Sequence, residues 1–204
     1  TDCNIAFFNI SNLTVGTSGY SSVGCLAGNT DEGNIMKCRA DECSINLKSG
    51  EFYSGIMVGD CNTKISDCEV KSTESGLFST SSNVDMYAIG GLCGYMNEDV
   101  ETCSVSAPYF ANTLQVNCSQ YGMDRIGGLC GYATATVRTS SVQFSDGPIK
   151  TIDGGDYKSS IYASGDEAFI GGITGYSESM SEIIDCKYNG QSLTGISKNR
   201  GMII

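Results

Sequence analysis

The chain has 204 residues, a net charge of −11, 26 glycines and 11 cysteines. Its excess of acidic side chains excludes an electrostatic footprint for nucleic acid, and the lack of a basic cluster argues against docking on anionic lipid. Because histidine is absent, catalytic triads with an imidazole base and His-ligated metal sites are excluded. No stretch approaches the roughly 18 apolar residues of a membrane-spanning helix.

Cysteine usage and sequons predict the compartment. Eleven cysteines are many for a cytosolic protein and favour an oxidising environment. Three N-x-Ser/Thr sequons fit secretion and are glycosylation candidates: Asn9, Asn12 and Asn117. The first residues lack the basic start of a signal peptide. We therefore expect an extracellular or cell-surface protein, present as a mature or excised segment.

A glycine-rich apolar signature recurs five times. In chain order it reads VGCLAGN (23–29), GIMVGD (55–60), IGGLCGY (89–95), IGGLCGY (126–132) and IGGITGY (170–176). The last glycine of each copy is an anchor, and the anchors are spaced 31, 35, 37 and 44 residues apart: Gly28, Gly59, Gly94, Gly131 and Gly175. Alternation along the heptapeptide predicts one strand, whose glycines allow a positive φ or the close approach of a neighbouring segment.

A second signature follows each copy. It combines an apolar residue, two others, Cys or Ser, one more, and an apolar or aromatic residue, as ADECSI (40–45), ISDCEV (65–70), VETCSV (100–105), VRTSSV (137–142) and IIDCKY (183–188). TDCNI at residues 1–5 is similar to the tail of a further copy. Stacking these copies predicts a cysteine/serine ladder of Cys3, Cys43, Cys68, Cys103, Ser140 and Cys186.

The two signatures together predict an all-β fold. Short alternating stretches indicate half-buried strands, and no window has a helical stripe. A unit of 31 to 44 residues with three short strands and variable turns corresponds to one rung of a β-solenoid, whose apolar face is buried only when rungs stack. We expect one domain over 1–204 with about five rungs, either a segment of a longer array or a subunit that stacks end to end.

The glycine signature ends in a tyrosine in three copies. Stacked rungs would align Tyr95, Tyr132 and Tyr176 as a ladder, with Asn29 and Asp60 ending the row. A structural stacking role is the main interpretation. A tyrosine face that stacks on a ligand is the alternative.

The [IV]-G-G-[LI]-x-G-Y strand, followed by an apolar-x-x-[CS]-x-V strand, resembles the GLUG repeat. That repeat occurs in bacterial surface adhesins, in noncatalytic parts of secreted immunoglobulin A peptidases and in large secreted proteins of some protists. Its five copies cover nearly the whole chain. The resemblance implies a right-handed parallel β-solenoid on a surface or secreted protein, without catalytic activity.

The cysteines divide into two groups. In-register cysteines of a parallel sheet are about 4.8 Å apart with parallel Cβ vectors, whereas a disulfide needs Cβ atoms about 3.8 Å apart. We therefore expect the ladder cysteines to be buried thiols that fill space. The off-register cysteines are the disulfide candidates: Cys25, Cys38, Cys61 and Cys118. A zinc site is the alternative, and only CRADEC (38–43) approaches a ligand spacing.

Acidic residues follow several corner glycines. Stacked as an acidic edge, they form a solvated turn row or, as the alternative, a Ca²⁺ site bridging rungs; the candidate ligands are Asp31, Asp60, Asp99 and Glu178. No other cofactor is expected. A carbohydrate-active enzyme needs carboxylates beside a shielded cation, and the residues that could supply them are Lys64, Asp67, Asp99, Glu101 and Arg138.

We therefore expect a noncatalytic structural or adhesive module of a surface protein or filamentous appendage. Its partners would be copies of itself or neighbouring repeats, stacked end to end, or cell-surface glycans or proteins. The alternative is a carbohydrate-active lyase or glycosidase. The long insertion at 144–168 is interpreted as a binding loop or a packing lid.

Overall fold

The computed structural model describes residues 3–6, 8–14, 21–49, 51–73, 77–80, 85–108, 114–116, 124–145, 161–163, 168–190, 193–195 and 199–201. Within these ranges the chain forms strands and turns and no helix, so the all-β prediction is confirmed. Most of the 144–168 insertion lies outside the described residues.

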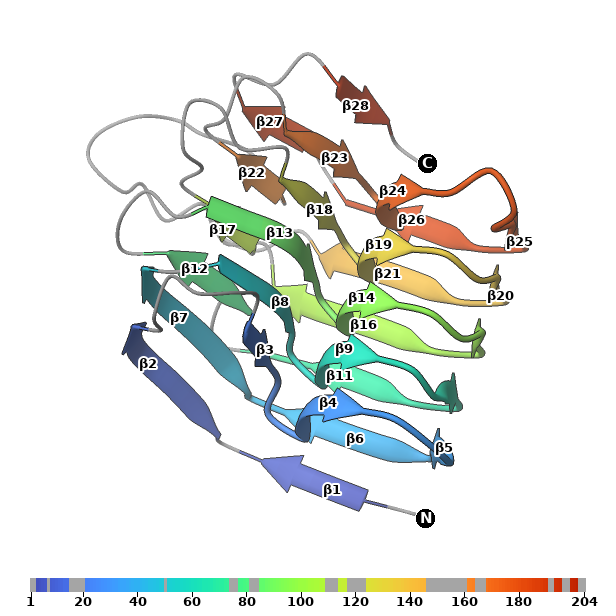
Figure 1. Ribbon diagram of the computed structural model, residues 1–204, viewed down its shortest axis with the longest axis horizontal. Coiled ribbons are helices and arrows are strands. Elements are labelled where there is room, and N and C mark those ends of the chain that lie inside the picture. The colour runs from blue at the N-terminus through green and yellow to red at the C-terminus, as the bar shows by residue number, and fades with distance from the viewer. Residues whose placement is uncertain are drawn as a thin grey trace.

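The strands form five parallel sheets, numbered here in the order in which the chain visits them (Figure 1). Sheet 1 contains β1 (Cys3–Ala6), β6 (Cys38–Asp41), β11 (Glu69–Lys71), β16 (Ser104–Pro108), β21 (Ser141–Ser145) and β26 (Lys187–Asn189). Sheet 2 contains β2 (Asn9–Thr14), β7 (Ser44–Ser49), β12 (Phe78–Thr80), β17 (Leu114–Val116), β22 (Ile161–Ala163) and β27 (Leu193–Gly195). Sheet 3 contains β3 (Ser21–Val23), β8 (Glu51–Gly55), β13 (Asp85–Gly90), β18 (Arg125–Gly127), β23 (Phe169–Gly171) and β28 (Asn199–Gly201).

The last two sheets contain five strands each. Sheet 4 contains β4 (Ala27–Thr30), β9 (Val58–Cys61), β14 (Cys93–Met96), β19 (Cys130–Ala133) and β24 (Thr174–Ser177). Sheet 5 contains β5 (Asn34–Met36), β10 (Lys64–Ser66), β15 (Val100–Glu101), β20 (Val137–Arg138) and β25 (Ile183–Ile184).

Each strand pairs with the strand five places along the chain, so five consecutive strands form one layer. The first layer is β1–β5, the fifth is β21–β25, and β26–β28 begin a sixth. The expectation of three strands per unit was therefore wrong. Strands as short as Val100–Glu101 contain two residues, too few to produce an alternating pattern in the sequence.

The core lies between the sheets, and each layer supplies the same apolar positions to it. Ile65, Val100 and Val137 are register neighbours in sheet 5, and all three are fully buried. Repetition of apolar residues at one position gives every layer an apolar neighbour above and below. This burial removes each layer's apolar face from water, which is the main driving force for stacking.

The repeated heptapeptide is not one strand, as the sequence suggested, but two strands joined by a corner. Strand β13 ends at Gly90 and β14 begins at Cys93. A Cβ on Gly90 would lie 2.0 Å from the Cys93 carbonyl oxygen, and one on Gly91 would lie 2.3 Å from the Gly128 oxygen. The corner therefore needs glycine because backbone segments approach closely.

Candidate functional site

The glycine signature positions a row of half-buried tyrosines in sheet 4. Tyr95, Tyr132 and Tyr176 are register neighbours, and the row continues through Asp60 to Asn29. The ring centroids of Tyr95 and Tyr132 are 4.9 Å apart, and those of Tyr132 and Tyr176 are 5.3 Å apart. The tyrosine stack predicted from the sequence is confirmed.

The anchor glycines explain why these tyrosines sit so close to sheet 3. Gly94 immediately precedes Tyr95, and a Cβ on Gly94 would lie 2.4 Å from the backbone nitrogen of Ser54. The five anchors occupy equivalent places in β4, β9, β14, β19 and β24, each directly before a residue of the row. Their lack of a side chain lets the backbone of sheet 4 pack against that of sheet 3.

Sheet 3 adds three side chains that the sequence analysis missed. The Tyr53 ring centroid is 5.1 Å from that of Tyr95, and Phe169 meets Tyr176 edge-on at 5.4 Å. The guanidinium carbon of Arg125 lies 4.8 Å from the Tyr132 ring centroid and 5.1 Å from that of Tyr176. We call Tyr53, Tyr95, Tyr132, Tyr176, Phe169 and Arg125 the aromatic ladder.

A signal for these three residues is present in the sequence. Tyr53, Arg125 and Phe169 each stand six residues before an anchor glycine, and sheet 3 aligns them at one register position. Ala88 holds the same position between Tyr53 and Arg125. The position varies in chemistry between layers, so no repeated letter marks it.

Two charged side chains, Glu178 and Arg125, contact the tyrosines of the ladder. The Tyr132 hydroxyl donates to the Glu178 carboxylate. Burial, together with this carboxylate, raises the pKa of the Tyr132 hydroxyl. The buried Arg125 guanidinium lies over both the Tyr132 and the Tyr176 rings, an arrangement that the negative face of an aromatic ring favours. The ladder is thus a partly exposed row of tyrosines with a buried cation beside it, and its aromatic surface is suited to contacts with apolar or sugar surfaces.

The cysteine ladder runs along the corner between sheets 5 and 1, with one correction. Cys3 pairs with Cys38, and the pairing of Arg39 with Glu69 sets Cys38 beside Cys68. Cys38 therefore occupies the ladder position in the second layer, which the sequence analysis had given to Cys43. The other members are as expected: Cys68, Cys103, Ser140 and Cys186.

The residue before each ladder member from Cys38 to Cys186 has a positive φ. It is Lys37, Asp67, Thr102, Thr139 or Asp185, with φ between 47° and 54°. The following thiol or hydroxyl donates to the carbonyl two residues earlier: from Cys68 to Ser66 at 3.2 Å, and from Ser140 to Arg138 at 2.8 Å. The ladder side chains are hydrogen-bond donors at a strained corner as well as space fillers.

Three of the four disulfide candidates are thiols in the structure: Cys25, Cys38 and Cys61. Cys38 belongs to the ladder, and the Cys61 thiol donates to the Thr63 carbonyl at 3.1 Å. Burial raises the pKa of Cys61 to about 11. Cys118 lies outside the described residues.

The four acidic candidates do not form an acidic edge. Asp60 lies in β9, Asp99 precedes β15, and Asp31 and Glu178 follow β4 and β24. Between the last two, the intervening layers carry a hydrogen-bonded polar row of Asn62, Asn97 and Thr134. Burial first, then the charge of Asp31, raises the pKa of Asp60. Among the described residues, no group of three or more Asp, Glu, Cys or His could hold a metal ion.

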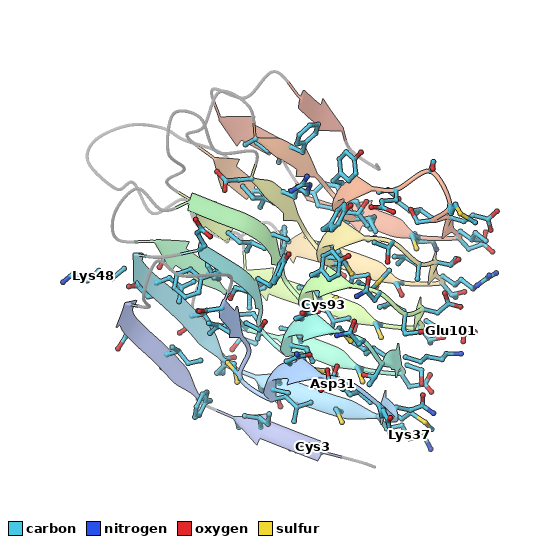
Figure 2. The ribbon with its side chains drawn as sticks, viewed as in Figure 1. Cys3, Asp31, Lys37, Lys48, Cys93 and Glu101 are labelled. Carbon is cyan, nitrogen blue, oxygen red and sulfur yellow. The ribbon has the colours of Figure 1, made fainter. Side chains whose placement is uncertain are left out.

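Two of the residues weighed for carbohydrate chemistry form an ion pair at the surface. The Lys64 ammonium lies 2.8 Å from the Glu101 carboxylate, and both side chains are nearly half exposed. Figure 2 labels Glu101 at the outer rim of the stack. This contact lowers the pKa of Glu101. Asp99 accepts a hydrogen bond from the Thr136 backbone at 3.0 Å, and Asp67 holds a positive-φ position. An exposed pair of this kind is a weakly stabilising contact.

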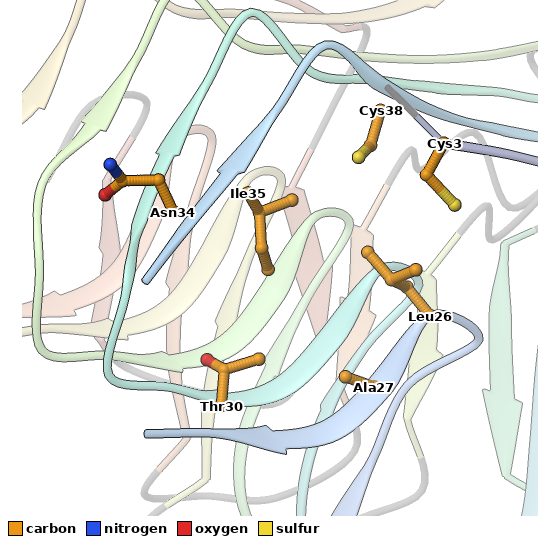
Figure 3. A pocket seen from close by; sticks show the side chains of 7 residues that line it. All are labelled: Cys3, Leu26, Ala27, Thr30, Asn34, Ile35 and Cys38. Atoms are coloured by element: carbon orange, nitrogen blue, oxygen red, sulfur yellow. The ribbon is translucent and has the colours of Figure 1, made fainter. Parts of the chain in front are cut away.

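A cavity of about 260 Å³ opens at the first layer (Figure 3). Its lining is mainly apolar and comes from the first layer and the start of the second: Cys3, Leu26, Ala27, Thr30, Asn34, Ile35 and Cys38. The strands of the first layer are edge strands in all five sheets. Backbone groups and apolar side chains are therefore presented together at this end.

Of the sequons, Asn9 is exposed in β2. Asn12 belongs to the same strand, but its side chain and all of Asn117 lie outside the described residues.

Among the residues described, no helix is long and apolar enough to cross a membrane. Comparisons with protein-family models, curated proteins and solved structures find no match for this chain.

Proposed function

We propose that the chain is a right-handed β-solenoid and acts as a noncatalytic structural or adhesive module of an extracellular surface protein or filament. Each layer would be one rung, giving five complete rungs and part of a sixth. The observation that carries the proposal is the continuous parallel pairing of successive strands in all five sheets. Repeat arrays of this kind use their residues to stack and present an extended surface.

End-to-end assembly with a second copy, or continuation by neighbouring repeats, would use the edge strands of the first and last layers. At the first layer, edge strands surround an apolar cavity that contains Leu26 and Ile35. At the opposite end, β24 and β25 are edge strands of sheets 4 and 5. A second copy could add its last layer to the first layer of this one with the same parallel pairing. Such a contact joins unlike surfaces and continues as a filament.

The aromatic ladder supports an adhesive role. Its rings run across several layers along the junction of sheets 3 and 4, and its tyrosines are half-buried. Tyrosine edges and hydroxyls can contact the apolar faces and hydroxyl groups of a glycan. The ladder is the surface we assign to a cell-surface glycan partner.

The extracellular assignment rests on the exposed sequon asparagine Asn9. The cysteine count gives it less support than the sequence suggested, because the ten described cysteines are thiols. Several of them donate hydrogen bonds at corners, a role that requires no oxidising compartment.

Negative-stain electron microscopy of the purified chain at several concentrations tests assembly. We expect fibres with an axial repeat of roughly 24 Å, since five layers stack at about 4.8 Å each. Ala27→Lys places a charge in the end cavity and should leave separate rods. Ser106→Lys, on the strand β16 of a middle layer, is the matched control and should still form fibres. Short rods of wild-type protein at every concentration would refute self-assembly.

Glycan-array binding and polysaccharide digestion test the rest of the proposal. Loss of binding in Tyr95→Ala, with retained binding in Ser106→Lys, is the expected result for an adhesive ladder. Equal binding by both variants would contradict the glycan assignment. Release of reducing or unsaturated ends from acidic polysaccharides would contradict the noncatalytic role and support the alternative, a carbohydrate-active enzyme.

A further inference from the structure

The two exact copies of the heptapeptide bring a pair of cysteines into contact. Cys93 in β14 and Cys130 in β19 are register neighbours, and their sulfurs are 3.2 Å apart. Both side chains are fully buried. Figure 2 labels Cys93 within the stack. The two thiols therefore meet inside the core, away from solvent.

Sulfur contacts hold this pair together. The Cys93 thiol donates to the Cys130 sulfur, and the Cys130 thiol donates to the Met96 sulfur at 3.6 Å. In the cysteine/serine ladder, Cys68 and Cys103 also interact through their side chains, but each thiol donates to a backbone carbonyl of its own corner, at 3.2 and 3.3 Å. The sulfurs of Cys93 and Cys130 are therefore in direct contact inside the core.

The backbone separation is compatible with a covalent bond. Neighbouring strands lie about 4.8 Å apart, and disulfides span Cα separations of about 4.4 to 6.8 Å. The sulfurs must close from 3.2 Å to about 2.05 Å. Parallel Cβ vectors leave some strain in the bond, and strained disulfides are readily reduced.

We propose that Cys93 and Cys130 form a reversible disulfide that joins the third and fourth layers. The oxidant is a small disulfide of the glutathione class. The thiolate of one cysteine attacks it, releasing one small thiol and forming a mixed disulfide; the second cysteine thiolate then displaces the second small thiol. Two protons and two electrons leave the pair, and the small disulfide becomes two thiols.

Burial controls the rate of this reaction. The hydrogen bond to Cys130, together with burial, raises the pKa of Cys93, so the folded core disfavours the attacking thiolate. Oxidation therefore requires transient opening of the strands and should accelerate in mild denaturant. The disulfide does not depend on the proposed function. If it does not form, the proposal of a structural or adhesive module is unaffected.

Mass spectrometry of the full chain tests the link. The protein is incubated with oxidised glutathione, with and without about 2 M urea, alkylated after denaturation and digested without reductant. Trypsin isolates Cys130 as the single cysteine of the peptide 126–138. We expect this peptide linked to peptide 72–125, which contains Cys93, Cys103 and Cys118, and fragmentation should assign the bond to Cys93. The intact mass should fall by about 2 Da, and dithiothreitol should reverse the change.

The repeat supplies conservative variants for the test. At this register position other layers carry Val58 and Thr174, so Cys93→Val and Cys130→Thr place residues that the fold already accepts there. Both should lose the link. Cys103→Ser removes a ladder cysteine and should keep it. Alkylated Cys130 under all conditions, a link from Cys130 to another cysteine, or loss of the link in Cys103→Ser would each overturn the proposal.

Discussion

Relief of backbone strain at Thr102 should stabilise the protein. Thr102 has φ 54°, its side chain is exposed, and its backbone nitrogen donates to the Arg138 carbonyl. A β-branched residue in this left-handed conformation is strained, at a cost on the order of 1–3 kcal/mol. Asparagine tolerates the conformation because its short polar side chain can hydrogen-bond locally. Thr102→Asn should therefore recover about 1 kcal/mol while losing no buried contact.

Thermal unfolding measures this gain. For a chain of this length, 1 kcal/mol shifts Tm by about 2–4 °C. The matched control is Asp67→Asn: Asp67 holds the same corner position in the layer before, with φ 53°, and already belongs to the residue types that tolerate it. Its Tm should not change. A Tm of Thr102→Asn equal to or below the wild-type value, with an unchanged control, would refute the strain argument.

Three further measurements address the cysteine/serine ladder, the anchor glycines and the buried thiol of Cys61. Cys103→Ser should cost at most about 1 kcal/mol in urea unfolding, because the hydroxyl keeps the donor, whereas Cys103→Ala should cost about 1–3 kcal/mol; equal losses would contradict the hydrogen-bonding role. Gly94→Ala should destabilise the fold by about 3 kcal/mol or more, since its Cβ would lie 2.4 Å from the Ser54 nitrogen. Gly33→Ala is the control: its Cβ meets nothing within 4 Å, so only the positive φ should destabilise the variant, by about 1 kcal/mol. Burial raises the pKa of Cys61 from 9.0 to about 11. Above pH 9 the thiol therefore ionises first in the unfolded chain, so the free energy of unfolding should fall between pH 9 and 11 and should not change below pH 9 because of this group. A Cys61→Val variant that loses as much stability between pH 9 and 11 would contradict the assignment.

The repeated glycines and tyrosines are sufficient to predict the stacking register of sheet 4. A parallel stack places equivalent residues of successive layers directly above one another, so a requirement at one place recurs as a repeated letter. Gly94 and Gly131 must both lack a side chain where sheets 3 and 4 meet, and Tyr95 stacks on Tyr132. The sequence therefore determined the all-β class and the register of sheet 4.

The path of the chain within one layer could not be predicted in the same way. The second signature fitted Cys43 as well as Cys38, because an apolar residue stands three positions before each: Ala40 and Ile35. Only the structure distinguished them: Ile35 stacks on Ile65, and Cys38 lies between Cys3 and Cys68 in the register of sheet 1. The backbone does not distinguish them, since Lys37 and Glu42 both have a positive φ. The second signature by itself does not show which of the two cysteines stacks on the ladder residue of the next layer.

By itself, then, the sequence determined which positions repeat, because stacking imposes the same local requirement on every layer. The tertiary structure decided which different positions meet. Arg125 and Tyr132 lie in different sheets across a corner, as do Tyr53 and Tyr95, and no repeated letter encodes such a contact. The aromatic ladder became visible only once the corner was folded, because bends of a few residues at Gly90 and Gly91 bring sheets 3 and 4 together.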